Sequence, residues 1–271
     1  MRLDVWGEEI HALTGGRPFD RSGPVAVLIH GSGMDATVWG LQSRYLAHHG
    51  MSVLAVDLPG HGRSGGAPLG NVEALGEWIV ALLDAAGVER AALAGHSLGA
   101  LVALACAHAA PERVRALALL GAAERMPVHP GLLAAAHDDV DDAIAMVVGW
   151  GFGRHAHLGG NPMPGLWMIG NALRLMERAG PGVLAADLGA CDAFSAGGEM
   201  AAALRCPTTV MIGTADRMTP AKAGRHLASL VSDARIVELS GSGHMMMVEA
   251  PEPTARALLA AFGEQAGAST T

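Results

Sequence analysis

The chain has 271 residues, of which 51% are hydrophobic, and it carries a formal net charge of -8 at pH 7. An acidic chain without a cluster of Lys and Arg is a poor partner for nucleic acid, and every long apolar run is interrupted before the roughly 18 residues that a membrane span requires. The first residues, MRLDVWGEE, contain early acids and no apolar core of a signal peptide, so a cytoplasmic location is expected.

Short apolar runs alternate with helical patterns along most of the chain. Runs that are apolar at nearly every position and are followed by Gly-rich loops are typical of strands buried on both faces. Because parallel strands need a crossover between them, the alternation predicts an α/β fold with a mostly parallel, doubly wound sheet. In chain order we predict an antiparallel edge hairpin over 3–14, strands over 25–30, 52–57, 90–94, 114–120, 208–212 and 235–239, and helices over 37–49, 71–86, 98–109, 220–231 and 251–262.

The alternation breaks between Gly121 and Arg205, where helical patterns, Gly and Pro occur without a convincing strand. We therefore expect a helical cap over 122–204, inserted into a core that comprises 1–121 and 205–271. The cap is rich in large, adaptable apolar side chains, which either pack in its interior or line a pocket. They are Met126, Met146, Trp150, Phe152, Met163, Trp167, Met168 and Met176.

Two stretches match the pattern Gly-x-Ser-x-Gly, in which the serine of a nucleophile elbow lies on a sharp turn between a strand and a helix. GHSLG at 95–99 follows the apolar run at 90–94 and precedes a helix-forming run, as the elbow requires. GRSGG at 62–66 lies among Gly and Pro residues that favour neither a strand nor a helix. Ser97 is therefore the candidate nucleophile, and Ser64 is expected to be a loop serine.

A serine nucleophile needs a histidine that accepts its proton and a carboxylate that orients this histidine. His244 and Asp216 each follow a predicted strand, and functional side chains gather beyond the carboxyl ends of the strands in such a sheet. The chain order Ser97, Asp216, His244 is the one that accompanies a nucleophile elbow. Glu124, which follows the strand over 114–120, is the alternative acid.

With these motifs the sequence resembles the α/β-hydrolase superfamily and, within it, the branch of small capped serine esterases and hydrolases. The resemblance covers roughly residues 20 to 263 and implies that two backbone N–H groups form an oxyanion hole. One donor belongs to Leu98 and the other to Ser32, with Gly33 as the alternative. The matching blocks are HGSG at 30–33, DLPGHGRS at 57–64, GHSLG at 95–99, GTADRMTP at 213–220 and GSGHMMMVEAPE at 241–252.

The remaining polar residues are expected to be structural. The side chain of His96 should point away from the nucleophile, and His30 should brace the oxyanion loop. His155 and His157 lack a carboxylate or Cys at ligand spacing, and the acidic run over 138–142 lacks the Gly and Glu of a calcium loop. The cysteines are odd in number and lack metal-type spacing, which disfavours disulfides. We therefore expect no metal and no organic cofactor.

The predicted activity is hydrolysis of a small to medium apolar carboxylic ester through an acyl-enzyme, with a small-molecule substrate as the partner. A carbon–carbon bond hydrolase, a lactonase, an amidase, a thioesterase and a perhydrolase use the same triad and are alternatives. A dehalogenase or an epoxide hydrolase would need a carboxylate nucleophile where this chain has Ser97. Outside enzymes, the alternative is a receptor that binds a small molecule in the capped pocket without catalysis.

Overall fold

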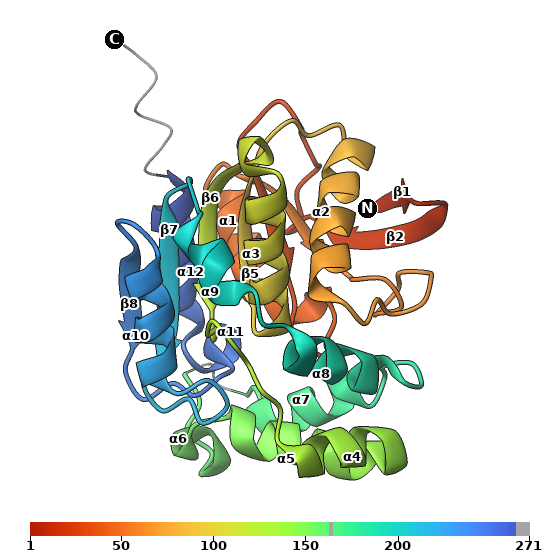
Figure 1. Cartoon of the computed structure of the whole chain (residues 1–271), viewed down its shortest axis with the longest axis vertical. Helices are drawn as coiled ribbons and strands as arrows, with labels where there is room; N and C mark the ends of the chain where they lie inside the picture. The colour runs from red at the N-terminus through yellow and green to blue at the C-terminus, as the bar shows by residue number, and fades with distance from the viewer. Residues whose placement is uncertain (163–164, 264–271) are drawn as a thin grey trace.

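The computed structural model describes residues 1–162 and 165–263, whose strands form a single sheet (Figure 1). The order of the strands across the sheet is β1 (Arg2–Val5), β2 (Glu8–Leu13), β4 (Ser52–Val56), β3 (Val25–Ile29), β5 (Ala91–His96), β6 (Val114–Leu120), β7 (Thr208–Gly213) and β8 (Arg235–Leu239). The pairs β1-β2 and β2-β4 are antiparallel, and all other neighbouring pairs are parallel. The α/β fold class and the mostly parallel sheet predicted from the sequence are confirmed.

Helices flank this sheet and gather at one end of it (Figure 1). Outside the segment between β6 and β7 they are η1 (Ala36–Trp39), α1 (Gly40–His48), α2 (Val72–Ala85), α3 (Leu98–Ala109), η2 (Pro111–Arg113), α10 (Ala221–Leu230), α11 (Met246–Glu249) and α12 (Pro251–Gly263). Between β6 and β7 they are α4 (Pro130–Asp138), α5 (Val140–Gly151), α6 (Arg154–His157), α7 (Met168–Met176), α8 (Val183–Ala193) and α9 (Gly197–Ala202). In the part of the chain that the structure describes, no helix has the length and apolarity to cross a membrane.

The central strands β3, β4 and β5 are buried on both faces, as their apolar runs predict. In β3, Val25, Val27 and Ile29 belong to the core cluster that includes α2 and α3. Their neighbours Ala26 and Leu28 point to the opposite face, into the cluster that includes α1 and α12. Because successive side chains of a strand alternate between faces, a run without polar positions requires a helical layer on each side.

The predicted helix over 37–49 begins differently in the structure. Its first turn is the 3-10 helix η1, and the α-helical part starts at Gly40. Asp35 caps this turn, because its side chain accepts a hydrogen bond from the N–H of Thr37 at 2.8 Å. The Asp side chain satisfies a backbone donor that has no partner within the helix, which fixes where the helix begins.

The segment between β6 and β7 contains no strand among its described residues, and α4 to α8 lie together below the sheet in Figure 1. In contrast, α9 packs against α3 and α10 beside the sheet. Of the apolar side chains predicted for this segment, Phe152, Met168 and Met176 are buried and belong to the core cluster that also includes α1 and α12. Trp167 is 70% exposed, and Met163 lies outside the described residues.

Candidate active site

Ser97 occupies the sharp turn between β5 and α3. Its backbone has φ 54° and ψ -120°, a conformation that is strained for a residue with a side chain. The turn is held because the N–H of Ser97 donates to the carbonyl of Leu120 at 2.9 Å and the N–H of Ala100 donates to the carbonyl of Ser97 at 2.9 Å. This conformation brings Ser97 into the wall of a cavity at the end of the sheet.

Glycine on either side of Ser97 lets α3 start directly against the sheet. A Cβ at Gly95 would overlap the carbonyl oxygen of Gly99. A Cβ at Gly99 would overlap the carbonyl oxygens of Ile29 and His30. The pattern Gly-x-Ser-x-Gly is thus required by the close approach of three backbone segments, for which a residue without a side chain is needed.

His244 and Asp216 lie in contact beyond the ends of β8 and β7. His244 Nδ1 is 2.8 Å from Asp216 Oδ2, and both side chains are buried. Asp216 also accepts hydrogen bonds from the hydroxyl of Thr219 at 2.6 Å and from the N–H groups of Met218 and Thr219 at 2.8 and 2.9 Å. Burial alone would raise the pKa of Asp216, but the electrostatic interaction with His244 and these hydrogen bonds outweigh it and lower the pKa below its usual value.

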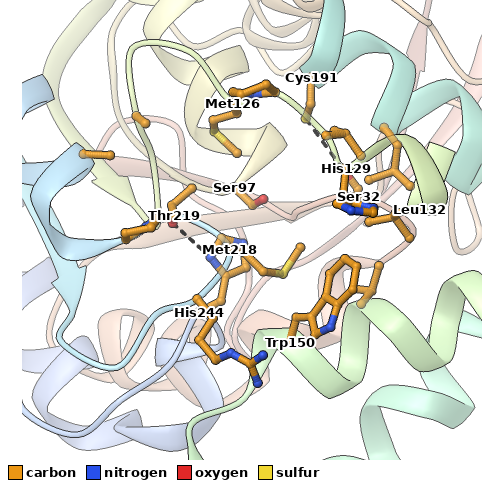
Figure 2. A pocket seen from close by; sticks show the side chains of 18 of the residues that line it. Ser32, Ser97, Met126, His129, Leu132, Trp150, Cys191, Met218, Thr219 and His244 are labelled. Carbon is orange, nitrogen blue, oxygen red and sulfur yellow. Dashed lines mark hydrogen bonds between the residues drawn. The ribbon is translucent and has the colours of Figure 1, made fainter.

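The ionised Asp216 decides which nitrogen of His244 carries the proton. A carboxylate only accepts hydrogen bonds, so Nδ1 of His244 is the donor and Nε2 is left as a base. His244 Nε2 is buried and has no hydrogen-bond partner within the described residues. His244 and Ser97 line the same cavity (Figure 2), so the Nε2 base of His244 and the hydroxyl of Ser97 lie in one cavity wall.

Glu124, the alternative acid, does not contact His244. Its carboxylate lies 3.5 Å from His226 Nε2, on the side of α10. The structure therefore brings Ser97, His244 and Asp216 to one site and leaves Glu124 outside it. The catalytic roles of the three residues remain predictions.

The loop after β3 carries the predicted oxyanion donors. The N–H of Gly33 donates to Asp187 Oδ2 at 2.8 Å, so this group is already bonded. For the N–H groups of Ser32 and Leu98, no hydrogen-bond partner is found among the described residues. Ser32 lines the cavity beside Ser97, and Leu98 is the first residue of α3, where a helical N–H has no partner in its own helix. This geometry favours Ser32 over Gly33 as the second donor.

The cavity has a volume of about 600 Å³ and a largely apolar wall (Figure 2). Its polar side chains include those of Ser32, Ser97, Thr219 and His244, and no Asp or Glu is among the described residues that line it. Arg125 and Arg217 also line it. The apolar wall includes Met34, Met126, Val128, Leu132, Val147, Trp150, Leu188 and Met218.

The comparison with known proteins identifies the family to which this architecture belongs. The family model described as "Alpha/beta hydrolase family" matches residues 26–257. The chain is an alpha/beta hydrolase. RutD of Azorhizobium caulinodans, whose name describes a carbamate hydrolase, is 30% identical to it over 256 residues, which are 90% of this chain and 92% of that one. The enol-lactonase of Burkholderia xenovorans has a crystal structure with a TM-score of 0.86 and 25% identity, covering 97% of this chain and 100% of that one.

A further similarity covers only part of this hydrolase. The dihydrolipoyllysine-residue acetyltransferase component of the acetoin cleaving system of Pseudomonas putida is 43% identical over 102 residues. These residues are 37% of the hydrolase and 27% of the acetyltransferase component. The hydrolase therefore matches about a quarter of the length of that relative.

His96 supports the site of the hydrolase through the backbone of His244. Its Nε2 donates to the carbonyl of His244 at 3.0 Å, and the two rings are 4.7 Å apart. Burial, together with the proximity of His244, lowers the pKa of His96 to about 3, so its ring is neutral. Thus His96 positions the backbone of His244 instead of facing the cavity.

His30 holds the loop that follows β3. Its Nε2 accepts a hydrogen bond from the N–H of Leu58 at 3.1 Å, so Nδ1 carries the proton and donates to the carbonyl of Gly31 at 2.9 Å. Burial, followed by the proximity of His61, lowers the pKa of His30 to about 4. The neutral ring joins the loop to the segment after β4.

Ser64 is bonded within its own loop. Its hydroxyl donates to the carbonyl of Asp57 at 2.7 Å and accepts from the N–H of His11 at 3.0 Å. In the acidic run, Asp139 caps α5 by accepting from the N–H of Asp142 at 3.2 Å.

Among the described residues, no group of three or more His, Cys, Asp or Glu side chains is arranged to hold a metal ion.

Sequence patterns did not single out three residues that the structure brings to the site. Thr219 has a local signal, because it follows Asp216 by three residues, a spacing at which a hydroxyl reaches back to a carboxylate. Asp187 and His61 contact each other at 2.9 Å although 126 residues separate them. No pattern within either segment indicates that contact.

The neutral, buried His30 and His96 make stability depend on pH. In the unfolded chain a histidine has a pKa of about 6.5, so below this pH the unfolded state binds more protons than the folded state. We expect the contribution of the two residues to be complete above about pH 6.5. It should fall by up to ~1.4 kcal/mol per pH unit for each histidine as the pH drops toward 4.

Urea unfolding between about pH 7 and about pH 5 measures this slope. The substitution His96→Gln should make the slope shallower, whereas His108→Gln, at an exposed position, should leave it unchanged. An equal slope in wild type and His96→Gln would contradict the assignment of a neutral buried ring.

The packing at the elbow predicts that Gly99→Ala destabilises the hydrolase. The added Cβ meets two backbone carbonyls that cannot move independently of β3, so we expect a loss of about 2 kcal/mol or more in the free energy of unfolding. Gly149→Ala is the matched control, because a Cβ at Gly149 in α5 meets nothing within 4 Å. It should be neutral or stabilising by up to ~1 kcal/mol, since Ala favours helix. Similar unfolding midpoints for the two variants would refute the packing argument.

Proposed function

We propose that this hydrolase cleaves carboxylic esters with Ser97 as nucleophile, His244 as general base and acid, and Asp216 as the group that orients His244. The observation that carries the proposal is the His244 ring. It is bonded to Asp216 through Nδ1 at 2.8 Å, and its Nε2 is unpaired among the described residues in the cavity that Ser97 lines. Such a base is what a serine hydroxyl needs to become a nucleophile at neutral pH.

In the proposed first step, Ser97 Oγ attacks the carbonyl carbon of the ester while His244 Nε2 takes the hydroxyl proton. The negative charge that develops on the carbonyl oxygen is stabilised by the N–H groups of Ser32 and Leu98. Each donor of this kind contributes roughly 3 kcal/mol to the stability of the transition state. When the intermediate collapses, the C–O bond to the alcohol breaks and His244 passes its proton to the departing oxygen.

The second step repeats this chemistry with water. His244 removes a proton from a water molecule, the resulting hydroxide attacks the acyl carbon, and the same N–H groups stabilise the oxyanion. The acid is then released, and the proton returns to Ser97 Oγ through His244. All proton transfers use side chains of this chain, so the proposed mechanism needs no cofactor.

For the substrate we propose a small to medium apolar ester, processed in the cytoplasm. A cavity of about 600 Å³ suits a ligand of that size, and its wall is largely aliphatic and aromatic. We also propose that 122–204 acts as the cap of a core formed by 1–121 and 205–271, since Met126, Leu132 and Trp150 of this segment line the cavity.

A lactonase is the second candidate, supported by the similarity to the enol-lactonase structure. A lactone is an internal ester, so Ser97 and His244 would perform the same steps while the alcohol stays attached to the acyl group. The two candidate activities are distinguished by their substrates. Hydrolysis rates are measured for open esters and for lactones of equal carbon number, and they show whether the enzyme acts on one class or on both.

The nucleophile is tested with two serine variants. Ser97→Ala should lower the hydrolysis of p-nitrophenyl butyrate by several orders of magnitude and abolish labelling by a fluorophosphonate probe. Ser64→Ala is the control, because Ser64 lies in the same pattern but is bonded to its own loop, and it should keep most of the activity. Hydrolysis that survives Ser97→Ala, or a wild type inactive on esters and lactones alike, would reject the proposal.

The size of the cavity is tested with Trp150→Ala. Removing this ring from the wall should enlarge the cavity and shift the preferred p-nitrophenyl ester toward longer acyl chains. Trp167→Ala is the matched control, because Trp167 lies in the same segment but is 70% exposed and does not line the cavity. An identical chain-length profile for wild type and Trp150→Ala would show that acyl chains bind elsewhere.

A further inference from the structure

Asp187 is a buried carboxylate on α8 that the proposed mechanism does not use. Its side chain is 1% exposed, and its Oδ2 accepts from the N–H of Gly33 at 2.8 Å and from His61 Nε2 at 2.9 Å. Burying a charge is costly unless it is paired and hydrogen-bonded, so the buried carboxylate of Asp187 depends on its contacts with Gly33 and His61. It joins α8 to the loops that follow β3 and β4.

His61 is protonated on both nitrogens in this arrangement. Its Nδ1 is 2.9 Å from the carbonyl of Pro59, which only accepts, and its Nε2 faces the carboxylate of Asp187. Burial alone would lower the pKa of His61, but the hydrogen bond to Asp187 and the charge of Asp187 outweigh it and raise the pKa above its usual value. Both ring nitrogens of His61 thus face acceptors, and the contact with Asp187 favours the protonated ring.

The two peptide groups that flank Ser32 are each held by a neighbouring side chain. The carbonyl of Gly31 accepts from His30 Nδ1 at 2.9 Å, and it shares a peptide plane with the N–H of Ser32. The N–H of Gly33 belongs to the next peptide plane and is bonded to Asp187. Since the C=O and N–H of a trans peptide point in opposite directions, the His30 bond sets the direction of the Ser32 N–H, and the Asp187 bond, by holding the next plane, restricts rotation of the loop about Ser32.

One face of α8 lies along this loop. A Cβ at Gly33 would come within 3.0 Å of Leu184, and Ser32 Oγ is 3.9 Å from Cys191 Sγ (Figure 2). Leu184, Asp187 and Cys191 are spaced at helical intervals, so all three project from the same side of α8. The contact with Gly33 is thus part of a continuous helix-to-loop interface.

We propose that Asp187, paired with His61, is a positioning residue that aims the N–H of Ser32 at the oxyanion. The inference rests on the proposed function and extends it to α8, which supports the catalytic loop in addition to lining the cavity. Asp187 touches no reacting atom, so its removal should impair the step in which the oxyanion forms more than the binding of substrate.

The test compares Asp187→Ala, Asp187→Asn and a control on the same helix. Asp192→Ala is the control, because Asp192 also accepts a backbone N–H, that of Val128 at 2.9 Å, but has no contact with the oxyanion loop. We expect Asp187→Ala to lower kcat for p-nitrophenyl butyrate by roughly 10²- to 10³-fold, the effect of losing one oxyanion donor, with KM changed only a few-fold. Asp187→Asn, which keeps an oxygen for Gly33 without the charge, should fall between wild type and Asp187→Ala. Asp192→Ala should keep the kcat of wild type.

Amide hydrogen exchange gives a readout independent of turnover. The Gly33 amide should exchange faster in Asp187→Ala than in wild type, and not in Asp192→Ala. Loss of Gly33 protection with unchanged kcat would overturn the positioning role. So would a kcat that returns to the wild-type value when rates are expressed per folded enzyme, because a loss of folded enzyme lowers the apparent kcat without changing KM. If Asp187→Ala does not fold, kcat, KM and the exchange of the Gly33 amide are compared between Asp187→Asn and wild type instead.

The rate at which a fluorophosphonate labels Ser97 separates this inference from the proposed function. The reagent builds negative charge on a phosphoryl oxygen in the same place, so its rate reports the oxyanion donors even without ester turnover. A wild type that is labelled but hydrolyses no ester rejects the proposed function alone, and slower labelling of Asp187→Ala still supports the positioning role. Equal labelling rates overturn it, and a Ser97 that is neither labelled nor active overturns both.

Discussion

The site depends on the backbone of Ser97, which is held at φ 54° where α3 starts against the sheet. A residue with a side chain costs of order 1–3 kcal/mol in such a conformation, so it persists only where the surroundings enforce it. The enforcing contacts are between backbones: Gly95 against Gly99, and Gly99 against the end of β3. Gly31 in turn lies so close that a Cβ there would come within 3.2 Å of Ser97 Cβ. The loop after β3 is thus packed on the elbow itself.

The histidine of the site is held from two sides. From the core, His96 Nε2 donates to the carbonyl of His244 at 3.0 Å. From the segment between β6 and β7, the carbonyl of Gly151 at the end of α5 accepts from the N–H of His244 at 2.7 Å. Glu249 strengthens this junction by accepting from the N–H of Gly153 at 2.9 Å. α5, which forms part of the cavity wall, therefore also fixes the backbone of His244, so a shift of α5 would move the His244 ring.

Four buried histidines near this edge of the sheet have different roles because their hydrogen-bond partners differ. His30 and His96 bond to backbone groups, and burial lowers their pKa values to about 4 and about 3. His61 and His244 each contact a buried carboxylate, at 2.9 and 2.8 Å. Burial without a nearby negative charge favours the neutral ring, whereas the contact with Asp187 raises the pKa of His61. The same residue type thus serves as a neutral brace in two places and as a partner of a carboxylate in two others.

The sequence by itself determined the order of strands and helices, the elbow at Ser97 and the pairing of Asp216 with His244, because each has a local signal. Apolar runs read as strands, glycines at fixed spacing mark the turn, and functional residues follow strand ends. Only the tertiary structure decided that Asp187 reaches the oxyanion loop, since 154 residues separate it from Gly33. Such a contact depends on where α8 lies in the fold, and this position is set by the packing of many side chains together. The pattern within α8 indicates only that the segment is a helix.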